Sequence, residues 1–272
     1  YGDGPVKVIP EVALLQKEIK FEKANKIGKS YNFPVILSAE AGVTYLAAGA
    51  GVSTLNSAIA ATLKEATVDA NQIIVRGQMD YEAAAKAVTS KESFQSATEL
   101  LVMNLQETGA KRIEIAMLYG QSSTGLGTAD SSVNLSATST TVTMLTAGWA
   151  PGIWAGLEGA QVNFYKVSDD SLISSAANAV FAVSTVDFTN KKIVFTGTST
   201  GISALDTALA AGDCYIHFKD AKSAEMVGLQ KIAVNTGTLF GISAASYGLW
   251  SGSTFSFGSA AVTAAKLLNM AG

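Results

Sequence analysis

The chain has 272 residues, of which 48% are hydrophobic and only 15% are charged, with a formal net charge of -3. Soluble domains carry about 25% charged residues, so we expect part of this surface to be covered by other protein. The small net charge argues against a general polyanion-binding surface. The single cysteine, Cys214, excludes an intrachain disulfide framework. The length allows one large or two modest domains.

Two long segments have almost no charge. Glu40 is the one charged residue between Lys29 and Lys64, and there is none between Lys231 and Lys266. Neither segment contains the run of about 18 uninterrupted apolar residues that a membrane span needs, because Gly, Ser, Thr and Asn are scattered through both. We therefore expect no membrane association and predict that these segments are buried against other protein.

Residues 1–30 form a predicted N-terminal arm with six lysines and four acidic residues. Helix signals run from Pro10 to Gly28. The charged face is either a solvated helix surface or a contact for an acidic partner or nucleic acid. Because the chain opens on Tyr1 and the helix predicted over 260–270 stops with the chain, we expect the sequence to be incomplete at both ends.

The pattern over residues 31–82 predicts an extended excursion, in which the chain runs outward along one strand and returns along another. Tyr31–Leu37 predicts an edge strand interrupted by Pro34, and Gln72–Arg76 predicts the strand that returns. A Gly- and Ala-rich passage lies between them. Two strands around such a tip bury little apolar surface by themselves, so we expect this excursion to lean on a neighbouring chain.

The strongest helix signal falls within residues 83–120. Ser90 is the predicted N-cap and Gly120 the stop, and apolar residues between them follow near-helical spacing along one stripe. Thirty residues would make a rod of roughly 45 Å. Gly109 costs about 1 kcal/mol relative to Ala, so the pattern allows a bend there.

Residues 121–220 predict an inserted β-rich domain, a small barrel or a sandwich, after a Gly/Ser/Thr linker over 121–132. The clearest signal is a hairpin from Val180 to Thr196, and further strands are predicted over 140–145, 161–166 and 214–218, with a helix over 204–210. Residues 221–272 then return to the first part of the fold. The predicted fold class is α+β.

The chain offers few side chains suited to catalysis, because it has only one histidine and one cysteine. His217 and Cys214 lie three residues apart on a predicted strand, so they face opposite sides and form neither a dyad nor a zinc site. Gly28-Lys29-Ser30 lacks the earlier glycine of a phosphate-binding loop, because that position holds Lys23. A pair of distant carboxylates stays open. We predict no enzyme and no catalytic, cofactor-binding or metal-binding residue.

The residues expected to contact other subunits are aromatic or charged and lie in the excursion or in flexible surroundings. The three tryptophans sit among Gly, Pro and Ser, where they serve either as interface anchors or as core residues. The full set is Tyr31, Phe33, Tyr45, Lys64, Arg76, Trp149, Trp154 and Trp250.

Two stretches carry a family resemblance. SFQSATELLVMNLQETGAKRIEIAMLYGQSSTGLG and MVGLQKIAVNTGTLFGISAASYGLW resemble the spine helix and a later segment of Hong Kong 97-type capsid proteins of tailed bacteriophages. The resemblance implies a Hong Kong 97-like fold: an arm over 1–30, an extended loop over 31–82 lying on an adjacent subunit, a spine helix over 83–120 and an inserted β domain over 121–220. Residues 221–272 would return to the peripheral and axial core, with little chain left for an axial domain.

The implied function is that of a major capsid protein. Copies would form the pentamers and hexamers of an icosahedral shell, assembled in the host cytoplasm and found in the virion, around double-stranded DNA held by non-specific contact. Portal, scaffolding and decoration proteins are further partners that the resemblance allows, and no cofactor is implied. Some members crosslink a lysine to an asparagine between subunits, and Lys64 is a candidate by its location. The alternatives are an encapsulin-like cellular compartment or a surface-layer type of structural assembly.

Overall fold

A computed structural model describes residues 14–19, 30–49, 51–52, 54–78 and 91–252, with the side chains of 91–100 left aside. The fold is mixed α+β, in agreement with the predicted class, and divides into two compact units. The barrel unit comprises Tyr1–Glu22 and Asn71–Lys231, and the loop unit comprises Lys23–Ala70 and Ile232–Gly272. The two units are described in turn.

The long helix of the barrel unit, α3 (Lys91–Tyr119), ends where the sequence predicted. It runs unbroken through Gly109, and Gly120 N–H donates to the Ala116 carbonyl at 2.8 Å to close its last turn. Burial does not follow a single stripe. Ile115, Ala116 and Met117 are buried in succession, so the last turns are enclosed on several sides.

Two polar side chains near the end of α3 are buried and bonded. Lys111 donates to the Ala155 carbonyl, and the Glu114 carboxylate accepts from Leu15 N–H at 2.7 Å and from Gln16 N–H at 2.9 Å. Leu15 opens the short helix α1 (Leu15–Glu18), whose first N–H groups have no partner within the helix. Glu114 therefore fixes α1 against α3.

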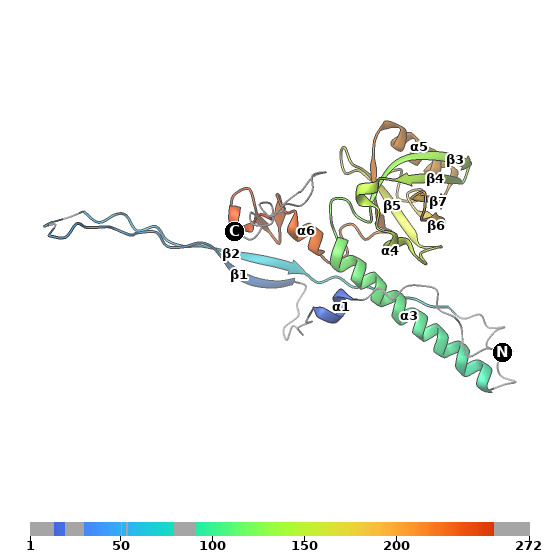
Figure 1. The fold of residues 1–272 in the computed structure, drawn as a ribbon, viewed down its shortest axis with the longest axis horizontal. Helices are drawn as coiled ribbons and strands as arrows, with labels where there is room; N and C mark the ends of the chain where they lie inside the picture. The colour runs from blue at the N-terminus through green and yellow to red at the C-terminus, as the bar shows by residue number, and fades with distance from the viewer. Residues whose placement is uncertain (1–13, 20–29, 50, 53, 79–90, 253–272) are drawn as a thin grey trace. The chain divides into compact units, whose positions relative to one another are not determined.

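The remainder of the barrel unit is a closed barrel of six antiparallel strands (Figure 1). Its order is β3-β4-β7-β6-β5-β8, so the predicted β domain is a barrel and not a sandwich. Helix α5 closes one side, and its N-cap, the Thr198 hydroxyl, accepts from Gly201 N–H at 3.1 Å. The bounds are β3 Thr128–Ser136, β4 Ser139–Met144, η1 Thr146–Gly148, α4 Pro151–Trp154, β5 Gln161–Lys166, β6 Phe181–Asp187, β7 Lys192–Thr196, α5 Ser199–Ala211 and β8 Cys214–Phe218.

Aromatic rings fill the barrel. Phe164 meets Phe181 and Phe195 edge to face, with ring centroids 5.2 and 5.0 Å apart, and Trp154 meets Phe195 in the same way at 6.3 Å. All four rings are fully buried. Such edge-to-face pairs contribute about 0.5–1.5 kcal/mol beyond their burial. The barrel thus has the apolar core of an independently stable domain.

The loop unit is built on two antiparallel strands, β1 (Ser30–Ser38) and β2 (Thr62–Asp69), paired from Ser30 with Asp69 onward. Between them, residues 39–49, 51–52 and 54–61 extend as a long, narrow excursion (Figure 1). A small cluster packs at the strands: Leu37, Ala66 and Ile242 are buried, with Phe33, Val35, Phe240, Tyr247 and Trp250 against them. Helix α6 (Leu229–Ala233) crosses the boundary between the two units. The loop unit then contains β9 (Thr238–Leu239), β10 (Ile242–Ser243) and η2 (Gly248–Trp250).

Two sequence predictions are wrong within these elements. The returning strand is β2, not Gln72–Arg76, which is extended but belongs to no strand. Its apolar residues do not mark a buried strand, because Ile73, Ile74 and Val75 are 46%, 84% and 41% exposed, although Val75 also lies against Gly109 of α3. The predicted linker over 121–132 already contains the start of β3, since its Ser, Asp and Thr residues hide the strand among turn-like residue types.

Other predictions are confirmed or lie outside the described residues. The β6–β7 hairpin and the strands β4, β5 and β8 occur at the predicted positions, and α5 starts five residues before the predicted Ala204. The proposed Ser90 cap, most of the arm over 1–30 and the helix over 260–270 lie outside the described residues.

Candidate assembly surface and a buried polar junction

The excursion between β1 and β2 is held together by few hydrogen bonds. Ala41 N–H donates to the Ile59 carbonyl at 3.0 Å, and Asn56 bridges the two sides by donating to Thr44 Oγ1 and to the Val43 carbonyl, both at 2.8 Å. We call residues 39–61 the loop. These hydrogen bonds join its two sides at a few points, but they do not form the regular ladder of a β-sheet.

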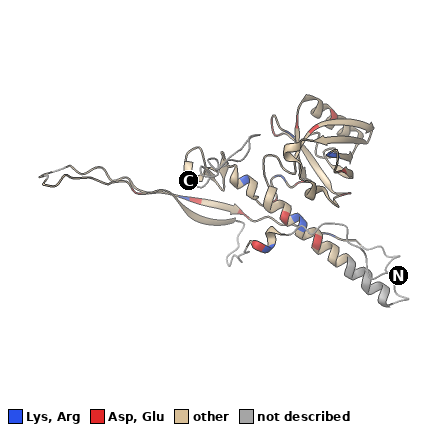
Figure 2. Ribbon diagram, in the orientation of Figure 1, with Lys and Arg blue, Asp and Glu red and all other residues tan. Residues whose placement is uncertain are grey.

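Charge is absent from most of this loop. Glu40 stands near its base, and the next charged residue is Lys64 in β2, so the extended ribbon is tan in Figure 2. Solubility is normally maintained by exposed charge, which this segment lacks.

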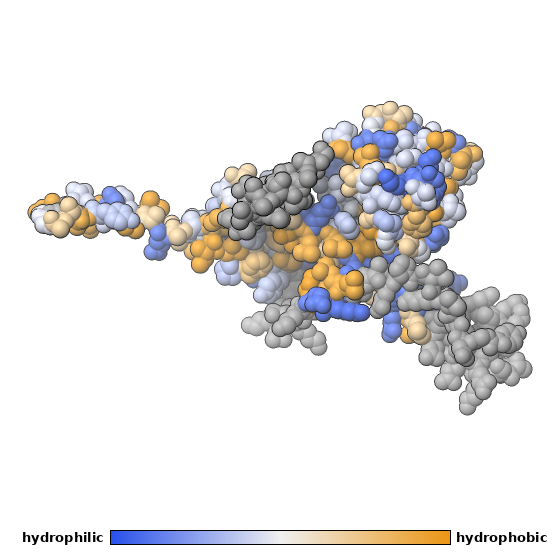
Figure 3. All heavy atoms as spheres, viewed as in Figure 1, coloured by the Kyte–Doolittle hydropathy of each residue, from blue (hydrophilic) through white to orange (hydrophobic). Residues whose placement is uncertain are grey.

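Apolar side chains project from the loop into solvent. The exposed fraction is 92% for Tyr45, 73% for Leu55, 64% for Val43 and 60% for Ile59, and orange spheres mark the loop in Figure 3. Burying one such side chain is worth about 1.5–3 kcal/mol. Exposed apolar surface of this kind is typical of sites that contact protein, membrane or ligand.

The structure places the predicted contact residues of the strands on the loop unit. Tyr31 is exposed, and its ring centroid lies 6.0 Å from that of Phe33, which packs on the small cluster at the strands. Lys64 is exposed in β2 and lines a shallow groove with Phe33. Arg76 is exposed in the barrel unit, so it is not part of this group.

The tryptophans separate into different roles. Trp154 is 0% exposed within the barrel, so the interpretation of it as a contact with another subunit is wrong, because a fully buried ring cannot meet a partner without unfolding the domain. Trp149 is half-buried beside the barrel core, and its ring centroid lies 6.4 Å from that of Phe188. Trp250 belongs to the loop unit, where its Nε1–H donates to the Leu239 carbonyl at 3.0 Å.

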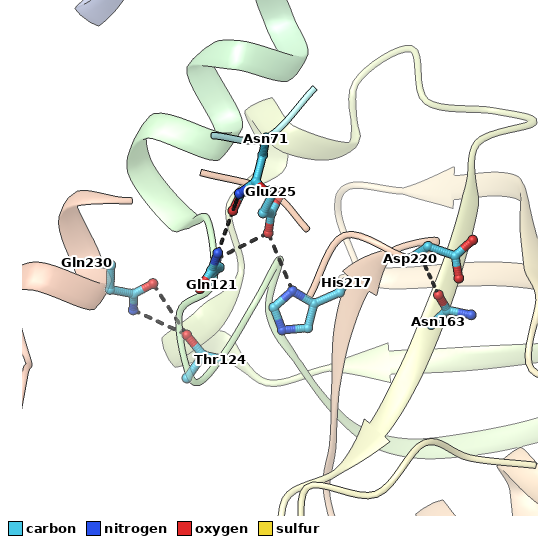
Figure 4. A network of polar contacts seen from close by, with 8 residues as sticks. All are labelled: Asn71, Gln121, Thr124, Asn163, His217, Asp220, Glu225 and Gln230. Atoms are coloured by element: carbon cyan, nitrogen blue, oxygen red, sulfur yellow. Dashed lines mark hydrogen bonds and ion pairs between the residues drawn. The ribbon is translucent and has the colours of Figure 1, made fainter. Parts of the chain in front are cut away.

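A polar junction lies where the chain enters and leaves the barrel (Figure 4). The Glu225 carboxylate accepts from Gln121 N–H at 3.2 Å and lies 3.7 Å from Nδ1 of His217. Its backbone carbonyl accepts from Gln121 Nε2 at 2.5 Å and from Asn71 Nδ2 at 3.1 Å. Glu225 thus joins three segments that are distant in sequence, which sequence reasoning did not find because no local pattern marks it.

His217 is 1% exposed, and its ring meets the rings of Tyr165 and Tyr215 edge to face. The Cβ of any side chain at Gly125 would lie 2.9 Å from its Nε2, so that nitrogen faces the backbone of a turn. Cys214 points into the barrel core on the opposite side of β8, as alternation predicted. Burial raises the pKa of the Cys214 thiol to about 11, which keeps it protonated at neutral pH.

We expect Glu225→Gln to loosen this junction. The amide cannot accept as strongly from Gln121 N–H and loses the charge beside His217, so the cost is about 1–2 kcal/mol of unfolding free energy. Hydrogen exchange should rise at Gln121 and through 219–228 while the barrel strands stay protected. Unchanged exchange at those positions would show that Glu225 does not hold the junction together. The control Glu158→Gln should leave exchange at Gln121 and at 219–228 unchanged.

Comparisons with protein-family models, with curated proteins and with solved structures gave no match. In the described part of the chain, no group of three or more His, Cys, Asp or Glu side chains is placed to hold a metal ion. Among the helices so described, none combines the length and apolar character that crossing a membrane requires.

Proposed function

We propose that this chain is a self-assembling shell protein, the major capsid subunit of an icosahedral shell with the Hong Kong 97-type fold around double-stranded DNA. The observation that carries the proposal is the loop, which exposes apolar side chains on an uncharged ribbon. Such a segment gains its stability only when another surface covers it. The resemblance of the helix and later segments to coat proteins supports the viral form of the proposal.

The two units have different roles in the proposed assembly. The barrel and the end of α3 share a large core that is complete within one chain. The strands of the loop unit have only a few buried residues, and none of the described residues of the loop beyond them is buried. The loop is therefore the part that reaches a neighbouring subunit. Repeated many times around a shell, apolar burial of about 25 cal/mol per Å² outweighs the cost of association at each contact.

Purification of the full chain tests the proposal. We expect fast-sedimenting closed shells, or ring-shaped oligomers, by electron microscopy and analytical ultracentrifugation. Nuclease-resistant double-stranded DNA inside the shells supports the capsid form, whereas enclosed protein favours the encapsulin-like alternative. A folded monomer that persists at micromolar concentration would contradict self-assembly.

A further inference from the structure

A groove of about 640 Å³ lies within the barrel unit. It is lined by the extended segment Gln72–Arg76, by α3 around Arg112, and by the end of β8 with the chain that follows it, including Phe218 and Lys219. None of the features described above explains what this groove does.

Arg112 is the unusual group in the groove. Its guanidinium lies 3.3 Å from the ring centroid of Phe218, and no hydrogen bond or ion pair joins it to the described residues. Burial lowers the pKa of Arg112 to about 10, and the charge of Glu225 offsets this only in part. Glu225 is itself occupied by Gln121 and His217.

A desolvated guanidinium without an acceptor is costly, and proteins nearly always pair such a charge. The planar fork of arginine offers donors that match a carboxylate with two parallel hydrogen bonds. The stacking on Phe218 holds the fork in one plane, so it is ready to receive such a group. Among the described residues, Arg112 therefore has the partial compensation of the Glu225 charge but no hydrogen-bonded anion.

The wall of the groove suits an extended peptide. The backbone of Gln72–Arg76 is extended yet unpaired in any described strand ladder, and Ile74 is 84% exposed. The segment is also held in place, because Asn71 donates to the Glu225 carbonyl and Val75 lies against Gly109. A fixed, unpaired, β-forming edge is a template for a strand from another chain.

We propose that this groove is a docking site for an extended, carboxylate-bearing segment of a second copy of this chain. Charge complementarity supports this occupant, because Arg76, Arg112 and Lys219 line the groove of a subunit whose net charge is -3. A nucleic acid fits less well, since Asp220 and Glu225 line the same groove and oppose a row of phosphates, whereas one carboxylate needs to meet only Arg112. The inference rests on the proposed self-assembly.

A zero-length crosslink identifies the anion directly. Arg112→Lys puts a primary amine in the groove, and a carbodiimide joins that amine only to a carboxylate in contact with it. We expect assemblies made from mixed isotope-labelled and unlabelled subunits to yield a peptide of one copy linked through position 112 to an acidic peptide of another. Links confined to one copy, such as to Glu225, would overturn the proposal. Wild-type assemblies have no amine at this position and serve as the control.

Assembly measurements provide a second test. Ile74→Asp places a charge at the mouth of the groove on a side chain that contributes little to folding, and Arg112→Gln removes the cation. Each is expected to raise the protein concentration needed for assembly at least tenfold, while Val167→Asp, at a 55% exposed position of the barrel, leaves it unchanged. If the wild type assembles and both groove variants assemble at the same protein concentration, the groove proposal is wrong while the proposed self-assembly stands. If the wild type stays monomeric, the proposed function fails first.

Discussion

Leu55→Asp is expected to abolish assembly and to leave the subunit folded. Leu55 is 73% exposed in the loop, so its replacement removes no contact from the core of either unit. In an assembly the same side chain would be buried against a neighbour, where the change loses about 2 kcal/mol of apolar burial and adds the several kcal/mol needed to desolvate a carboxylate. Each affected contact weakens by a factor of at least about 100.

The measurement is sedimentation velocity over a range of protein concentrations, with circular dichroism and thermal melting to establish folding. The matched control is Val133→Asp, which introduces the same charge at a 62% exposed position on β3. It should assemble like the wild type. Leu55→Ala should give an intermediate result, because it removes apolar area without adding charge. Normal assembly of Leu55→Asp would show that the loop does not form the principal contact.

Local patterns were sufficient to predict much of the barrel. Strand-forming residue types predicted β5 over 161–166 and β8 over 214–218, which are the bounds that the structure has. The long apolar spacing and Gly120 likewise located the end of α3. Residue type rather than a one-sided burial pattern carried these predictions, because β8 is buried from Cys214 through His217 and the end of α3 is buried on several sides.

The failures arise where distant contacts decide the structure. Gln72–Arg76 has the residue types of a strand, but the pairing of β1 selects Thr62–Asp69 instead, with Lys64 opposite Val35. Trp154 lies in a Gly- and Pro-rich stretch typical of a surface, yet a short helix turns its ring into the barrel. Neither outcome can be read from the segment itself.

The junction at Glu225 was also invisible in the sequence. Its partners lie 104 residues away at Gln121 and 154 residues away at Asn71, and each alone is an ordinary polar residue. The same holds for Arg112, whose neighbour Phe218 comes from the last strand of the barrel. Polar groups of this kind acquire a role only after the barrel closes, so candidate sites here had to come from the structure.

The largest effect on folding is expected from Phe164→Ala. Phe164 is 0% exposed and contacts two further rings, Phe181 and Phe195, so the change removes its burial and leaves a cavity between them. Substitutions of this type cost about 3–5 kcal/mol, which is a large share of the 5–15 kcal/mol that stabilises a typical domain. Chemical denaturation followed by near-ultraviolet circular dichroism measures the loss.

Phe188→Ala is the matched control for this change. Phe188 is 44% exposed, so the same truncation there should cost less than about 1.5 kcal/mol. Assembly of Phe164→Ala should fail together with folding, whereas Leu55→Asp should lose assembly and keep its denaturation midpoint. That contrast separates the barrel, which makes the subunit stable, from the loop, which makes it associate. Equal losses of stability for Phe164→Ala and Phe188→Ala would mean that the aromatic cluster does not hold the barrel together.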